Sequence, residues 1–104
     1  MTQAVPRRAV TLDELHRNRN QIQAAAARYG IHTVRVFGSV AAGTVTADSD
    51  LNLLVEVKPG HGHLDLTGFL LAVENRLAVF TQVATPAGLA PCLRDRVLAE
   101  AVPL

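Results

Sequence analysis

The sequence has little of several features that define other classes of protein. Its 104 residues include a single cysteine, Cys92, which excludes an internal disulfide. Tryptophan is absent and aromatic residues make up 4%, so few rings are available to stack on nucleic-acid bases. The formal net charge is +1, which gives no electrostatic basis for a dedicated nucleic-acid binder. No apolar run approaches the roughly 20 residues that a membrane span needs. We therefore expect neither direct nucleic-acid binding nor a membrane segment.

What remains is typical of a small folded domain. Apolar residues make up 49% and charged residues 18% of the chain. We expect one domain over residues 11–104, preceded by an N-terminal extension of residues 1–10. Pro6-Arg7-Arg8 would interrupt any secretory signal in that extension, which predicts a cytoplasmic protein. Because so short a chain buries only a modest core, a homo- or hetero-oligomer would add stability.

The most informative stretch is residues 34–57, VRVFGSVAAGTVTADSDLNLLVEV. It predicts a strand over 34–37, a turn at Gly38-Ser39, a small-residue segment over 41–49 and a second strand over 51–57. Ten residues lie between Ser39 and Asp50. Because alternate residues of a strand share a face, we expect Asp50, Asn52 and Leu54 on one side and residues 51, 53 and 55 on the other. The first of these faces begins with a carboxylate and an amide close to the turn.

The flanking segments predict the rest of the fold. Residues 11–14 have capping-box spacing and open a helix that ends at Gly30. A second amphipathic helix is predicted over 64–77, a third strand over 78–84, and a last helix after Pro91. The order α-β-β-α-β-α predicts an α/β (α+β) domain, with a small mixed sheet and helices packed on one side.

Three groups of polar residues allow both a structural and a functional interpretation. The basic and amidic residues 17–20 are interpreted as a solvated helix face, with a nucleotide or RNA contact as the alternative. His61 and His63 are interpreted as loop residues, with a metal pair as the alternative, because neighbouring ligands to complete a site are lacking. Asp65 suits the positive end of a helix dipole better than a catalytic role.

The Gly-Ser pair, ten residues and then D-x-D on a strand form a recognisable signature. In carrying Gly38, Ser39 and Asp50 at this spacing, the chain resembles nucleotidyltransferases with the DNA polymerase beta-like fold. Its compactness is similar to that of minimal nucleotidyltransferase (MNT) domains, many of which are antitoxins beside HEPN ribonuclease toxins. The resemblance continues through LDLTGFLLAVENRL (64–77) and TPAGLAPCLRDRVLAEAVPL (85–104).

The resemblance implies roles for five residues. Gly38 and Ser39 would hold the phosphates of ATP, the nucleotide donor, while positions 50, 52 and 82 would be catalytic and hold Mg²⁺. The chain departs from the family at two of these positions: the second acid is Asn52, and aligning Thr85-Pro86 with the family's Thr-Pro puts Gln82 at the third. A site with about −1 charge instead of about −3 neutralises two Mg²⁺ ions poorly. Magnesium binding at Asp50, Asn52 and Gln82 is therefore expected to be weak or lost.

Three hypotheses follow from this pattern. The first is an MNT-family antitoxin that neutralises a HEPN-type toxin by forming a complex, with impaired transfer of AMP from ATP to a toxin tyrosine. The second is an active Mg-dependent nucleotidyltransferase with a reduced metal site, and the third an ATP-binding scaffold module. Asp48 and Glu56 are the acids that could replace the missing ones, although neither lies where the family has its acids. Natural loss and deliberate inactivation would both leave this pattern.

Overall fold

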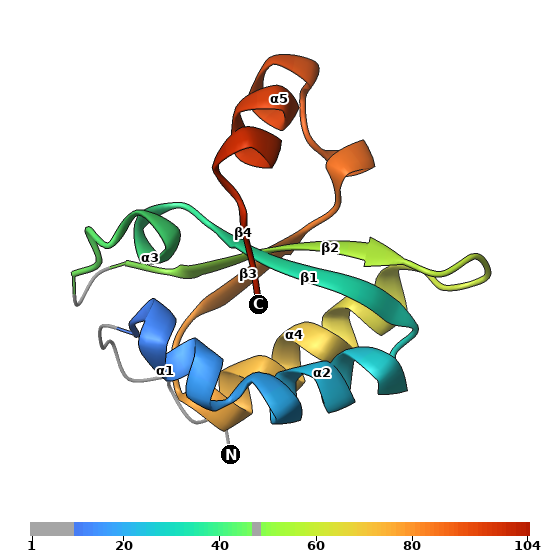
Figure 1. Cartoon of the computed structure of the whole chain (residues 1–104). Coiled ribbons are helices and arrows are strands. Elements are labelled where there is room, and N and C mark those ends of the chain that lie inside the picture. The colour runs from blue at the N-terminus through green and yellow to red at the C-terminus, as the bar shows by residue number, and fades with distance from the viewer. Residues whose placement is uncertain (1–9, 47–48) are drawn as a thin grey trace.

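A four-stranded mixed sheet forms the centre of the computed structural model, which describes residues 10–46 and 49–104 (Figure 1). The strand order is β3-β2-β1-β4. The central strands β1 (Ile31–Phe37) and β2 (Leu51–Val57) are antiparallel, and β3 (Thr81–Ala84) runs parallel to β2. The short edge strand β4 (Val102–Pro103) is antiparallel to β1. The predicted mixed α/β architecture is confirmed, and β2 has the predicted bounds.

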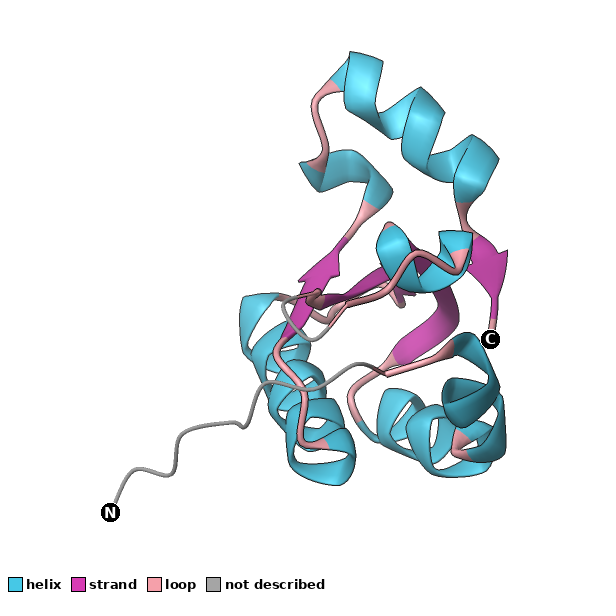
Figure 2. Cartoon of the chain, turned by 90° about the vertical axis from the view of Figure 1, so that its left-hand side faces the viewer, coloured by secondary structure: helices cyan, strands magenta, loops and turns pink. Residues whose placement is uncertain are grey.

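Helices lie on both sides of this sheet. Figures 1 and 2 show α1 (Leu12–Arg17), α2 (Arg19–Arg28) and α4 (His63–Leu77) on one side and α5 (Pro91–Glu100) on the other. The four-residue helix α3 (Ser39–Ala42) follows β1 directly, and a 3₁₀ turn, η1 (Pro86–Gly88), leads from β3 toward α5. The predicted packing of helices on one side of the sheet thus holds for α1, α2 and α4. It does not hold for α5, which lies on the opposite side.

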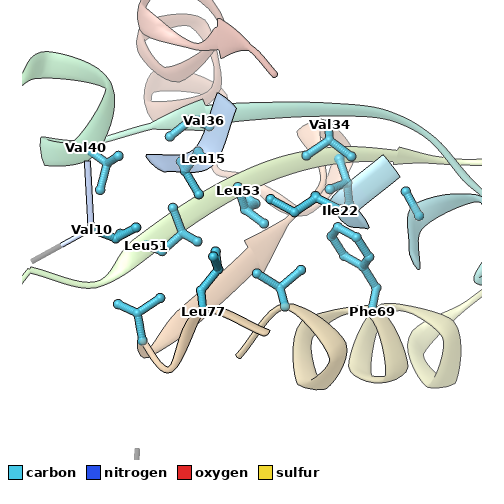
Figure 3. Packing of buried hydrophobic residues seen from close by; sticks show 14 of the residues in the cluster. Val10, Leu15, Ile22, Val34, Val36, Val40, Leu51, Leu53, Phe69 and Leu77 are labelled. Carbon is cyan, nitrogen blue, oxygen red and sulfur yellow. The ribbon is translucent and has the colours of Figure 1, made fainter. Parts of the chain in front are cut away.

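The main core lies between the sheet and α1, α2 and α4 (Figure 3). Leu15, Ile22, Leu53 and Phe69 are each at most 1% exposed and come from α1, α2, β2 and α4. Leu54, which we expected on the polar side of β2, is also buried but lies outside this cluster. It belongs to the other face of the sheet, where the single buried residue of the fully described helix α5 is Val97. The second face of β2 is thus partly apolar.

The predicted first helix is two helices with a break at Asn18. The Asn18 side chain donates a hydrogen bond from Nδ2 to the Glu14 carbonyl at 2.9 Å, and its Oδ1 accepts one from Arg76 Nε at 3.3 Å. A side chain that bonds to backbone in this way competes with the regular helix pattern. The second helix, α2, ends as predicted, because Gly30 follows the C-cap with φ +71°.

Two strand predictions needed correction. The third strand begins at Thr81 rather than at 78, because Ala78 ends α4 in the left-handed conformation (φ +53°). The first begins earlier than predicted, at Ile31. Strand β4 was not predicted: a two-residue segment with a proline has no periodicity to read, and it exists only through pairing of Val36 with Val102 and Arg35 with Pro103.

Most of the predicted extension, residues 1–9, lies outside the described residues, whereas Val10 is fully buried in the core. Among the helices of the described part of the chain, none combines the length and apolar character required to cross a bilayer.

Candidate functional site

The turn at Gly38 has a backbone conformation that demands glycine. Its φ of +78° and ψ of −152° lie in a region that is essentially restricted to glycine. A Cβ placed on Gly38 would lie 2.9 Å from Asn52 Nδ2, so the Asn52 side chain occupies the space beside this backbone. The following residues form α3, closed by hydrogen bonds from the Ala42 N–H to the Gly38 carbonyl and from the Thr44 N–H to the Ser39 carbonyl. Because Gly38 has no side chain, its backbone can pack directly against Asn52 on the neighbouring strand.

The register of the sheet brings the two amide residues together. Asn52 on β2 pairs with Phe37 on β1 and with Gln82 on β3. Phe37 immediately precedes Gly38, so Asn52 lies between the turn and Gln82. Positions 52 and 82, which the resemblance aligned from separate stretches of the sequence, are thus direct neighbours across parallel strands.

Asp50 contacts the same group from the loop that leads into β2. Gln82 Nε2 donates a hydrogen bond to Asp50 Oδ2 at 3.1 Å. The assignment of nitrogen toward oxygen follows from chemistry, because an ionised carboxylate only accepts hydrogen bonds. The adjacent backbone is fixed by a hydrogen bond from the Leu51 N–H to the Phe80 carbonyl at 2.8 Å. The three predicted metal-site residues are therefore gathered at one end of β2.

The donor set does not fit a pair of magnesium ions. It offers one carboxylate and two neutral amides, and one carboxylate oxygen already accepts a hydrogen bond from Gln82. Within residues 10–46 and 49–104, no cluster of three or more His, Cys, Asp or Glu side chains could hold a metal. Asp48 lies outside the described residues. Glu56 is four residues beyond Asn52, about 13 Å along the strand, and contacts His32 at 3.8 Å.

A cavity of about 580 Å³ adjoins the Gly38-Ser39 turn. One wall comes from the turn and α3, and the other from two charged residues of α5, Arg96 and Glu100. Sequence reasoning assigned no role to these two residues. Spacing on α5 shows that they are one helical turn apart, but only the tertiary structure brings α5 opposite the turn.

Several of the other polar residues considered in the sequence have structural partners. Asp65 accepts hydrogen bonds from the Gly62 N–H and pairs with His61 Nδ1 at 3.1 Å, which confirms its interpretation as a residue of the helix start. Arg17 pairs with Asp13 at 3.9 Å on an exposed helix face. These contacts favour the structural interpretation of Asp65 and of Arg17.

A mixed sheet with a Gly-Ser turn after β1, and with positions 50, 52 and 82 gathered beside that turn, defines the class of nucleotidyltransferase domains. The comparison with protein families gives the same result. The chain belongs to the nucleotidyltransferase domain family, whose model matches residues 18–92. This membership confirms the resemblance found in the sequence.

Three individual proteins are similar to this chain. A Methanocaldococcus jannaschii protein, named as a protein adenylyltransferase, is 35% identical over 75 residues, which cover 72% of this chain and 81% of the relative. A solved structure described as a minimal nucleotidyltransferase is 44% identical, covers 91% of this chain and 97% of its own, and superposes with a TM-score of 0.82. A toxin–antitoxin crystal structure with AMP-PNP has a TM-score of 0.69 at 16% identity, covering 83% of this chain and 71% of its own. The last of these supports the fold alone.

Proposed function

We propose that this protein is an MNT-type antitoxin that neutralises a HEPN-type ribonuclease toxin in the cytoplasm by forming a complex with it. In this proposal the domain binds ATP at Gly38 and Ser39 and transfers AMP slowly or not at all. The observation that carries the impaired activity is the hydrogen bond from Gln82 Nε2 to Asp50 Oδ2. It occupies the single carboxylate of the gathered site with a neutral amide, where a metal-dependent transferase needs acids.

Charge explains why transfer should be slow. When AMP is transferred to a tyrosine, the phenolic oxygen forms a bond to the α-phosphorus, pyrophosphate leaves, and the phenolic proton is lost. Negative charge gathers on the attacking and leaving oxygens, and divalent ions usually stabilise it. Loss of one such stabilising group costs about 10²- to 10³-fold in rate. With amides at both 52 and 82, we expect a loss of at least this size.

The proposal of a toxin partner starts from a similarity of fold. The toxin–antitoxin structure with AMP-PNP contains a chain with this architecture. Co-expression with a HEPN-type ribonuclease toxin that arrests growth tests the proposal. Neutralisation by a complex predicts that growth is restored by the wild type and equally by D50A, which removes the last carboxylate. Growth restored by the wild type alone would show that neutralisation requires Asp50 chemistry.

The second candidate function is protein adenylylation with a reduced metal site. It is favoured by the 35% identity to a protein named as a protein adenylyltransferase. Incubation of the chain and its toxin partner with ATP and either Mg²⁺ or Mn²⁺, followed by intact-mass spectrometry, separates the two candidates. Rapid conversion of the toxin to a form heavier by one AMP, absent with D50A, would establish the enzyme and contradict the impaired-site proposal. An unchanged toxin mass in a stable complex supports neutralisation by binding.

A further inference from the structure

The cavity beside the Gly38-Ser39 turn has a charged wall as well as a neutral one. The neutral wall consists of the turn, small residues of α3 and Thr44. The charged wall belongs to α5. In Figure 2, α5 is the long helix at the top, and the short helix α3 lies below it. Among the described residues that line the cavity, Arg96 carries the one positive charge and Glu100 the one negative charge.

Arg96 is free to turn toward a ligand. Its Nε lies 3.5 Å from Glu100 Oε1, and the two side chains are 76% and 59% exposed. An exposed pair at i,i+4 contributes little to stability, so a more highly charged anion can displace the carboxylate. The planar guanidinium also matches phosphate with two parallel hydrogen bonds, which strengthens such an exchange.

The neighbouring arginine shows the contrast. Arg94 Nε donates to the Pro86 carbonyl at 2.7 Å, and its second guanidinium nitrogen donates to the Leu89 carbonyl at 3.3 Å. These hydrogen bonds connect α5 to the η1 segment, and Val97 is the buried residue of the helix. Arg94 therefore fixes the position of α5, and Arg96, two residues later, is presented at the cavity. The family match ends at residue 92 and does not include either arginine.

We propose that Arg96 is a phosphate-binding residue of the nucleotide site, and that Glu100 competes with the bound phosphate for it. This inference rests on the proposed binding of ATP at Gly38 and Ser39. The gathered site around Asp50 lacks the acids that would hold Mg²⁺ against the phosphates. Arg96 supplies positive charge from the protein itself, so ATP binds without a divalent ion.

The test measures ATP binding by isothermal titration calorimetry in EDTA. The variants are R96Q, E100Q and the control R17Q, which removes an arginine of similar exposure (71%) from an i,i+4 pair with Asp13, away from the cavity. We expect R96Q to weaken binding about tenfold, or about 1.4 kcal/mol. E100Q should tighten it about threefold, and R17Q should leave it unchanged. Thermal unfolding of R96Q verifies that the fold is intact.

The outcomes separate the inference from the function on which it rests. Wild-type binding that R96Q leaves unchanged, or that R17Q weakens equally, overturns the role of Arg96 and keeps ATP binding. Absence of wild-type binding overturns both. Inorganic tripolyphosphate, titrated alone, gives a second readout: if Arg96 contacts phosphate, this ion should bind the wild type and bind R96Q more weakly. Equal affinity of the two proteins for tripolyphosphate would place Arg96 away from the phosphates.

Discussion

Gln82 donates a hydrogen bond to Asp50, 3.1 Å away, and is also the cross-strand neighbour of Asn52. The amide at 82 stabilises the Asp50 carboxylate by donating this hydrogen bond, whereas an acid at 82 would repel it. Gln82 therefore connects the two other positions of the gathered site, by a side-chain hydrogen bond to Asp50 and by backbone register with Asn52.

Restoring the two acids should exchange stability for metal binding. In EDTA, N52D/Q82D should unfold at a lower temperature than the wild type, because three carboxylates then lie together. Added Mg²⁺ at 100 times its dissociation constant should restore about 2.7 kcal/mol in the variant. The measurement is thermal unfolding with and without Mg²⁺.

The control for that experiment adds the same charge elsewhere. N20D/Q21D changes two exposed residues of α2 and should respond little to Mg²⁺. A magnesium response of the wild type as large as that of N52D/Q82D would show that amides suffice as ligands.

Gly38 should tolerate substitution less well than another glycine of positive φ. G38A forces alanine into a glycine-only conformation and places its Cβ against Asn52, so we expect a loss of about 2–3 kcal/mol in the free energy of unfolding. Gly43 has φ +76° and ψ +16° with open space around it, so G43A should cost about 1 kcal/mol. Urea unfolding measures both, and equal losses would mean that the Asn52 contact contributes nothing.

Gly68 offers a case in which helix propensity and packing oppose each other. Alanine is favoured over glycine in a helix interior by about 1 kcal/mol, yet a Cβ on Gly68 would overlap the Tyr29 ring. We expect packing to prevail, with G68A destabilised by about 1–3 kcal/mol. A double-mutant cycle with Y29A measures the coupling: with the ring removed, G68A should become neutral or stabilising. Additive effects would show that α2 and α4 separate without cost.

Truncation of a buried apolar side chain of α4 should cost far more stability than truncation of an exposed one. Phe69 is fully buried between α4 and the sheet, and F69A should cost about 3–5 kcal/mol through lost burial and the remaining cavity. Leu71, on the same helix, is 50% exposed, and L71A should change stability by about 0.5 kcal/mol or less. Urea unfolding tests both values, through the shift of the midpoint at an unchanged dependence of the unfolding free energy on urea concentration. A small effect at Phe69 would contradict the packing of α4.

The sequence predicted the fold through strong local patterns. The alternation over 51–57 and the helical periodicity over 64–77 gave β2 its bounds and α4 its bounds within one residue. The same local patterns gave wrong element boundaries at two positions. The apolar periodicity over 11–30 hid the break at Asn18, and the strand-like composition of 78–84 hid the left-handed turn at Ala78.

By itself, the sequence determined the nucleotidyltransferase family and the positions 38, 39, 50, 52 and 82, because motif spacing and residue type are properties of the linear chain. Only the tertiary structure decided that Gln82 bonds Asp50, that β4 closes the sheet beside β1, and that Arg96 lines the cavity beside Gly38. These contacts join residues far apart along the chain, and strand register and helix packing fix them. No local periodicity encodes such relationships, since they arise when separate elements bury their apolar faces together.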